Sequence, residues 1–165
     1  MSVVNFRGYV LPKCNISAQD KRKIINDLSL CPQTFHGQGK FVKDSDKFKI
    51  YRETNTKYRL PRFYGLKEFG DPSVSRLHDG IGIQCPFNGK LKHALGQHVA
   101  CETMIKSLKT KGGGILSLPT GYGKTTCALY ILSQIGLKTL IIVHKEFLLN
   151  QWKERIRQFL PDANI

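Results

Sequence analysis

The chain has 165 residues, of which 26 are Lys or Arg and 12 are Asp or Glu, so its formal net charge is +14. That charge predicts a polyanionic partner without identifying it, and a hydrophobic content of 41% argues against wholesale disorder. The longest apolar run, 127–132, is too short to span a membrane, and the five cysteines include no CxxC pair. With no secretion signal at the N-terminus, we expect an intracellular protein without membrane contact, in cytoplasm, nucleus or virion.

The sequence divides into two regions that differ in how regularly apolar segments and Gly or Pro residues are spaced. Residues 1–90, with a net charge of +8, are punctuated irregularly by Gly and Pro, and predict a small basic α+β accessory region. Within it, Ser17 and Asp20 form a capping-box pattern that begins a helix ending at Leu28. Short strands are predicted over residues 48–51 and 57–63.

Residues 91–165, with a net charge of +6, have the regular segment lengths of an α/β domain. The pattern predicts helices over residues 97–108, 124–135 and 147–160, and apolar strands over 115–118 and 139–143. Right-handed crossovers would place the two strands side by side in one parallel sheet.

The segment between the first of these strands and the next helix predicts a phosphate-binding loop. Gly121 and Gly123 let the main chain curl around phosphates at a helix N-terminus, where free N–H groups and the helix dipole favour anions. Lys124 would reach the β and γ phosphates and the Thr125 hydroxyl would hold Mg²⁺. The candidate nucleotide-binding residues are Pro119, Thr120, Gly121, Tyr122, Gly123, Lys124, Thr125 and Thr126. The alternative is a chance match in an ordinary turn; Leu118 stands where the strict pattern has Gly.

Residues 118–125, Leu-Pro-Thr-Gly-Tyr-Gly-Lys-Thr, resemble motif I of superfamily 2 helicases, and residues 142–152 resemble motif Ia of XPB-like helicases and those of large DNA viruses. Residues 62–70 and 87–97 are similar to the segment that precedes motif I in the viral members. The resemblance implies an incomplete RecA-like P-loop motor domain that uses ATP and Mg²⁺. It also implies that Gln97 reads adenine, although Leu95-Gly96 replaces the usual Pro-aromatic pair; the alternative for Gln97 is a surface residue that opens a helix.

Hydrolysis of ATP needs a carboxylate for Mg²⁺ and another for the attacking water. After Lys124 the only acidic residues are Glu146, Glu154 and Asp162, and none follows an apolar strand as motif II requires. The sequence therefore predicts the N-terminal portion of an ATP-dependent helicase, inactive by itself because the Walker B carboxylates are missing.

Two groups of residues are candidates for contact with nucleic acid. The resemblance to motif Ia implies that His144 and Lys145 touch its backbone; the alternative is a plain strand-to-helix turn. Phosphate-neutralising cations and stacking rings also alternate between residues 40 and 67, or else form a solvated basic face over core aromatics. We expect DNA rather than RNA, with transcription or replication machinery as further candidate partners.

Two other functions fit the same residues. One is a P-loop DNA translocase of another kind, such as the motor of a restriction enzyme or remodeler. The other is a non-catalytic nucleic-acid-binding module with an idle loop. The sequence also holds two cysteines and two histidines within seventeen positions, namely Cys85, His93, His98 and Cys101, but they lack a CxxC pair and the family resemblance implies no metal there.

Overall fold

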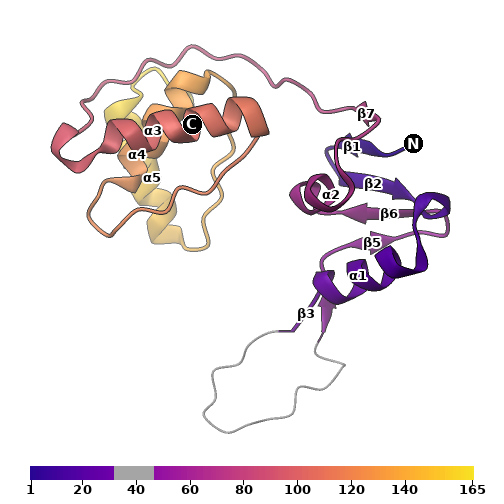
Figure 1. Ribbon diagram of the computed structural model, residues 1–165. Coiled ribbons are helices and arrows are strands. Elements are labelled where there is room, and N and C mark those ends of the chain that lie inside the picture. The colour runs from indigo at the N-terminus through magenta and orange to yellow at the C-terminus, as the bar shows by residue number, and fades with distance from the viewer. Residues whose placement is uncertain (32–46) are drawn as a thin grey trace, which may run out of the picture. The chain divides into compact units, whose positions relative to one another are not determined.

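A computed structural model describes residues 1–31 and 47–165 (Figure 1). The chain divides into two compact units, residues 1–78 and 79–165. The change of composition at residue 90 therefore does not mark the structural boundary. Residues 79–90 lie with the second unit because Cys85 is buried in its core and the Asn88 N–H donates to the Phe159 carbonyl at 2.7 Å.

The first unit is built on a five-stranded sheet in the order β5-β6-β2-β1-β7, in which only β1 and β7 run parallel. Its strands are β1 Val3–Asn5, β2 Gly8–Pro12, β5 Arg52–Glu53, β6 Lys57–Leu60 and β7 Val74–Ser75. A separate pair joins β3 Ser29–Leu30 to β4 Phe48–Lys49. The predicted strand at 48–51 is thus short, and the one at 57–63 ends at Leu60, where Pro61 becomes the N-cap of a helix.

Two helices complete this unit, α1 Ala18–Leu28 and α2 Arg62–Phe69, with a short 3-10 helix, η1 Lys13–Asn15, before α1. The predicted helix start is confirmed: Ser17 caps α1 and the capping box with Asp20 is complete. Alternation along the strands puts one set of apolar side chains on the same sheet face, where both helices supply further core residues. The buried cluster comprises Val4, Tyr9, Leu11, Ile24, Leu28, Tyr51, Tyr58 and Leu60.

Helix α2 packs closely on β2 because residue 65 has no side chain. A Cβ at Gly65 would lie 2.2 Å from Cγ of Tyr9, whose ring is 1% exposed. The Tyr9 ring stacks on Phe69 at the other end of the helix, with centroids 6.3 Å apart. This glycine therefore sets the distance between the helix and the sheet.

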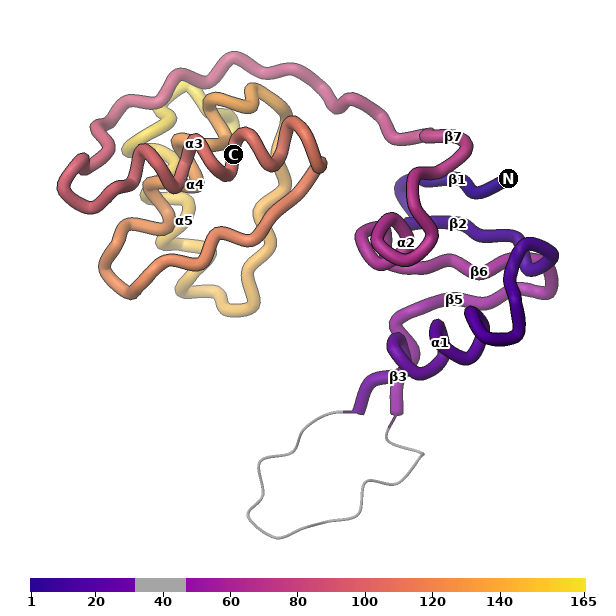
Figure 2. Tube along the Cα trace, in the orientation of Figure 1, coloured from indigo at the N-terminus to yellow at the C-terminus, as the bar shows by residue number. Residues whose placement is uncertain are grey.

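The second unit contains three α-helices, α3 Gln97–Lys111, α4 Lys124–Ile135 and α5 Glu146–Phe159, and the 3-10 helix η3 His93–Leu95. Residues 79–92 lead into these helices without a named helix or strand (Figure 2). One isolated bridge joins Gly82 to Leu137. The three helix predictions are confirmed to within three residues at each end. Gly112 and Gly136, with φ of 71° and 64°, end α3 and α4 as left-handed caps.

The parallel sheet predicted for residues 115–118 and 139–143 is not formed. Neither segment is a strand in the part of the chain that the structure describes. Their apolar side chains are exposed instead, Ile115 by 96%, Leu140 by 83% and Ile142 by 84%. A strand needs a neighbour about 4.8 Å away to satisfy its main chain, and two short segments alone rarely make a stable sheet. The sequence pattern identified two segments that could form strands, but it could not show whether another strand lies beside them.

None of the described helices combines the length and hydropathy that a membrane-spanning helix requires.

Substitution of Gly65 by Ala should destabilise the first unit, because the new methyl group overlaps the Tyr9 ring. We expect a loss of about 1–3 kcal/mol in the free energy of unfolding, a loss that the higher helix propensity of Ala only partly offsets. Urea denaturation followed by circular dichroism measures it. Lys67→Ala, on an exposed position of the same helix, is the control and should stay within about 0.5 kcal/mol. Equal behaviour of the two variants would contradict the packing argument.

Candidate nucleotide-binding site

The loop that precedes α4 depends on two glycines with left-handed main-chain conformation. Gly121 has φ of 81° and Gly123 has φ of 87°. A Cβ at Gly121 would meet nothing within 4 Å, so the loop is open at that point. At Gly123, a Cβ would lie 2.7 Å from Nε2 of Gln97. The first glycine therefore serves conformation, whereas the second serves both conformation and close packing.

The N-terminus of α4 faces this loop with its main-chain donors. Gly123 is the N-cap and has no side chain to accept a hydrogen bond, and no acidic residue lies in the first turn. The N–H groups of Lys124, Thr125 and Thr126 belong to that turn, where an α-helix offers them no acceptor of its own. With the positive end of the helix dipole, they form an arrangement suited to an anion.

The Lys124 ammonium folds back over the loop. Its Nζ donates to the carbonyl oxygens of Leu118 and Pro119, both at 2.9 Å. These acceptors are neutral, so charged phosphate oxygens would bind the same ammonium more strongly. The side chain is thus positioned at the loop by groups that a phosphate can replace.

Gln97 is buried, with 2% of its surface exposed, and both ends of its carboxamide are bonded to main chain. Its Oε1 accepts the Lys92 N–H at 2.8 Å, and its Nε2 donates to the Tyr122 carbonyl at 2.6 Å. The structure thus brings Gln97 into direct contact with the loop. Its contact here is with the loop itself, and recognition of adenine stays a prediction.

Helix α4 rests on α3 through two small buried side chains. Cys101 and Cys127 are both 0% exposed, and the Cys101 thiol lies 3.8 Å from the Cys127 carbonyl oxygen. Burial raises the pKa of the Cys101 thiol to about 12, so it stays protonated at neutral pH. Leu91 and Ile131 complete this cluster under the loop. The loop therefore stands on a packed apolar base.

His144 and Lys145 lie elsewhere in the unit. Both are exposed in the turn before α5, with Lys145 as the N-cap of that helix. Among the described residues, no hydrogen bond or ion pair joins them to the loop. Sequence reasoning missed Lys92, whose contribution is a main-chain N–H and therefore leaves no mark in the residue type. No group of three or more potential metal ligands comes together in the described parts of the chain.

A glycine loop at a helix N-terminus, with a lysine at the first helical position, defines a phosphate-binding-loop protein. Comparison with known proteins narrows this class. Residues 90–165 match the family described as Type III restriction enzyme, res subunit. The chain is similar to the XPB-like and viral superfamily 2 helicases, and the resemblance seen in motifs I and Ia is confirmed.

Three relatives illustrate the similarity. The chain is 30% identical over 153 residues to protein L396 of Acanthamoeba polyphaga mimivirus, whose name is that of an ATP-dependent RNA helicase. It is 34% identical over 122 residues to DNA 3'-5' translocase XPB2 of Sulfurisphaera tokodaii, and 33% identical over 115 residues to helicase 109L of Invertebrate iridescent virus 3. These alignments cover 91%, 72% and 64% of this chain but only 29%, 26% and 33% of the respective relatives.

Replacement of Gln97 by Ala should loosen the loop, because the Lys92 N–H and the Tyr122 carbonyl both lose a buried partner. We expect about 1–3 kcal/mol of destabilisation in the second unit. The fluorescence of Trp152, the single tryptophan, reports thermal unfolding there. Gln134→Ala, at an exposed position of α4, removes the same side chain without a buried bond and should leave the transition within about 0.5 kcal/mol. An unchanged transition in Gln97→Ala would show that the two bonds do not hold the loop.

Proposed function

We propose that this chain is the nucleotide-binding part of an ATP-dependent motor that acts on nucleic acid, a helicase or translocase. The observation that carries the proposal is the open loop at the start of α4, with Lys124 poised over it and Gln97 fixing its main chain. The names of the relatives support the same class of activity.

In this proposal the residues present fit Mg-ATP, since Gly121 leaves an open cradle beside unshared N–H donors. The first-turn N–H groups hold phosphate oxygens, Lys124 neutralises the β and γ phosphates, and the Thr125 hydroxyl holds Mg²⁺. Bound Mg²⁺ supplies charge neutralisation on the phosphates. Gln97 serves the site by holding the loop, so Gln97→Ala should weaken ATP and GTP equally, whereas adenine recognition would weaken ATP alone.

We also propose that residues 115–118 and 139–143 are strands of a RecA-like sheet in the whole protein. Their exposed apolar residues, Ile115, Leu140 and Ile142, are those that such a sheet would bury. The family match over residues 90–165 supports this placement.

The nucleic-acid partner belongs to the same proposal. One relative carries the name of an RNA helicase and another that of a DNA translocase. We propose DNA as the track, in keeping with the name of the translocase that is 34% identical over 122 residues. His144 and Lys145 would contact its backbone, since both are exposed ahead of α5.

A restriction-type motor is the second candidate. The matched family is described by the res subunit of a type III restriction enzyme, and such a motor would share the same loop. The two candidates require the same nucleotide chemistry of Lys124 and Thr125, so the tests below bear on both.

Lys124→Ala should abolish most nucleotide binding, because a charge-assisted contact to the phosphates is lost. We expect the affinity for a fluorescent ATP analogue with Mg²⁺ to fall about 10- to 100-fold in a direct titration. Lys106→Ala, an exposed lysine on α3, is the matched control and should bind as the unaltered chain does. If the unaltered chain and Lys124→Ala fail equally to bind, the loop has no nucleotide function in this chain.

Lys145→Ala should weaken binding to single-stranded DNA, because one phosphate contact is removed. The affinity is expected to fall about fivefold at 0.1 M salt, with a salt dependence about 0.7 shallower in a log–log plot. Fluorescence anisotropy with a labelled oligonucleotide measures both quantities. Lys111→Ala removes an exposed lysine from the last turn of α3 and should change the affinity less than twofold. If both variants lost the same affinity for DNA, Lys145 would contribute only to the overall positive charge and would not be a specific phosphate contact.

A further inference from the structure

The first unit contains a groove that no part of the nucleotide site uses. It has a volume of about 790 Å³ and lies where the β1–β2 turn meets the segment from β4 to β5 and the end of β6. Its lining joins cations to apolar and aromatic groups: Phe6, Arg7, Gly8, Lys49, Ile50, Tyr51, Arg52, Arg59, Leu60 and Pro61. Four of these residues are basic, and within the described chain the lining includes no carboxylate.

Two of these cations are neighbours on adjacent strands and repel each other. Arg52 on β5 lies directly opposite Arg59 on β6 in the antiparallel register. Like charges at directly opposed positions destabilise a sheet unless an anion lies near them. The pairing of two like charges therefore costs stability, and an anion bound between them would remove that cost.

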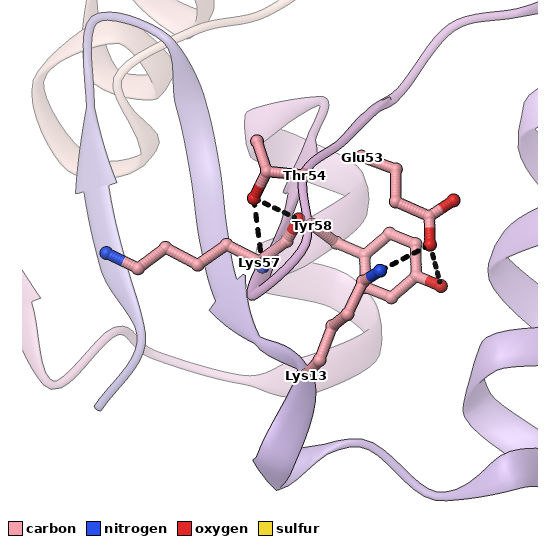
Figure 3. Close-up of polar contacts among 5 residues, drawn as sticks. All are labelled: Lys13, Glu53, Thr54, Lys57 and Tyr58. Carbon is pink, nitrogen blue, oxygen red and sulfur yellow. Dashed lines mark hydrogen bonds and ion pairs between the residues drawn. The ribbon is translucent and has the colours of Figure 1, made fainter.

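The neighbouring carboxylate does not relieve this repulsion. Glu53 alternates to the other face of β5, opposite Tyr58, where its Oε1 bonds Lys13 Nζ at 2.6 Å and accepts the Tyr58 hydroxyl at 3.0 Å (Figure 3). Hydrogen bonds from Lys13 and Tyr58 lower the pKa of Glu53. The acid is thus already engaged on the opposite face, away from the two arginines.

The rim of the groove also carries an aromatic ring in water. Phe6 is 82% exposed at the tip of the β1–β2 hairpin, and the Arg7 guanidinium carbon lies 5.1 Å from its ring centroid. Tight hairpin turns favour Asn and Gly, so a phenylalanine there serves neither the turn nor the core. An exposed ring beside a guanidinium is the arrangement on which a base can stack.

We propose that this groove is a second nucleic-acid site, which binds single-stranded nucleic acid through phosphate contacts from Arg52 and Arg59 and base stacking on Phe6. In this site a phosphate group would neutralise the two neighbouring guanidinium charges, and an unpaired base would stack on the exposed face of the Phe6 ring. The site lies wholly within residues 1–78 and involves no residue of the nucleotide loop. Its binding is therefore independent of ATP, and it stands or falls apart from the function proposed above.

The charge contribution is tested on the full 165-residue chain with a fluorescein-labelled oligothymidylate of twenty nucleotides, without nucleotide, by fluorescence anisotropy. The double variant Arg52→Gln/Arg59→Gln should bind about 25-fold more weakly at 0.1 M salt, with a salt dependence about 1.4 shallower. Its melting temperature should not fall, since the substitution removes like-charge repulsion. Lys21→Gln/Arg22→Gln on the exposed face of α1 removes the same charge and should change affinity less than twofold. Equal losses in the two double variants would overturn the proposal.

A variant of Phe6 tests whether the groove recognises nucleic acid in particular or binds any polyanion. Phe6→Ala should weaken oligothymidylate binding about tenfold and leave the affinity for inorganic polyphosphate unchanged, because polyphosphate has no base to stack. Phe63→Ala, an aromatic residue 51% exposed on α2 and outside the groove, should leave both affinities unchanged. Unchanged oligothymidylate binding by Phe6→Ala, or equal loss for both ligands, would overturn the assignment to nucleic acid. Lys124→Ala should bind the oligonucleotide normally even where it has lost ATP.

Discussion

The buried carboxamide of Gln97 is the contact on which the glycine loop before α4 depends. It accepts from the Lys92 main chain and donates to the Tyr122 carbonyl, so it fixes the loop one residue before Gly123. The carboxamide occupies the space that a Cβ at Gly123 would need, and α4 begins at the next residue. The direction in which the first turn of α4 presents its donors therefore follows from one side chain on α3.

The same side chain links the loop to its apolar base. Gln97 is the first residue of α3, and one helical turn later Cys101 is buried against α4 beside Cys127. Helix α3 is thus joined to the start of α4 by the hydrogen bond from Gln97 to the Tyr122 carbonyl, and one turn farther along α3 by close packing of two small thiols. Since packed interiors resist deformation, the loop is mounted on a base that keeps its shape.

Local chemistry made part of this structure predictable. The Ser17–Asp20 capping box and the glycine caps after α3 and α4 act within a few residues, and the helices they bound were predicted from sequence. Pairing acts over distance, so the apolar segments 115–118 and 139–143 could be recognised but not their lack of a neighbour. The contacts of Gln97 are with main-chain groups, which every residue carries. The sequence therefore located the loop and the glutamine but not the bonds between them.

Strand register explains how the first unit carries so much positive charge around a packed core. Alternation puts Glu53 and Tyr58 on the core side, where the carboxylate pairs with Lys13, and puts Arg52 and Arg59 on the other side. If β5 and β6 were shifted by one residue, every side chain would move to the opposite face of the sheet. The arginines would then be buried, and Tyr58, now only 1% exposed, would face solvent. Burial of uncompensated arginines is far costlier than their repulsion at the surface. The hydrophobic core thus fixes the two cations on the face of the sheet that lies away from Glu53 and Tyr58.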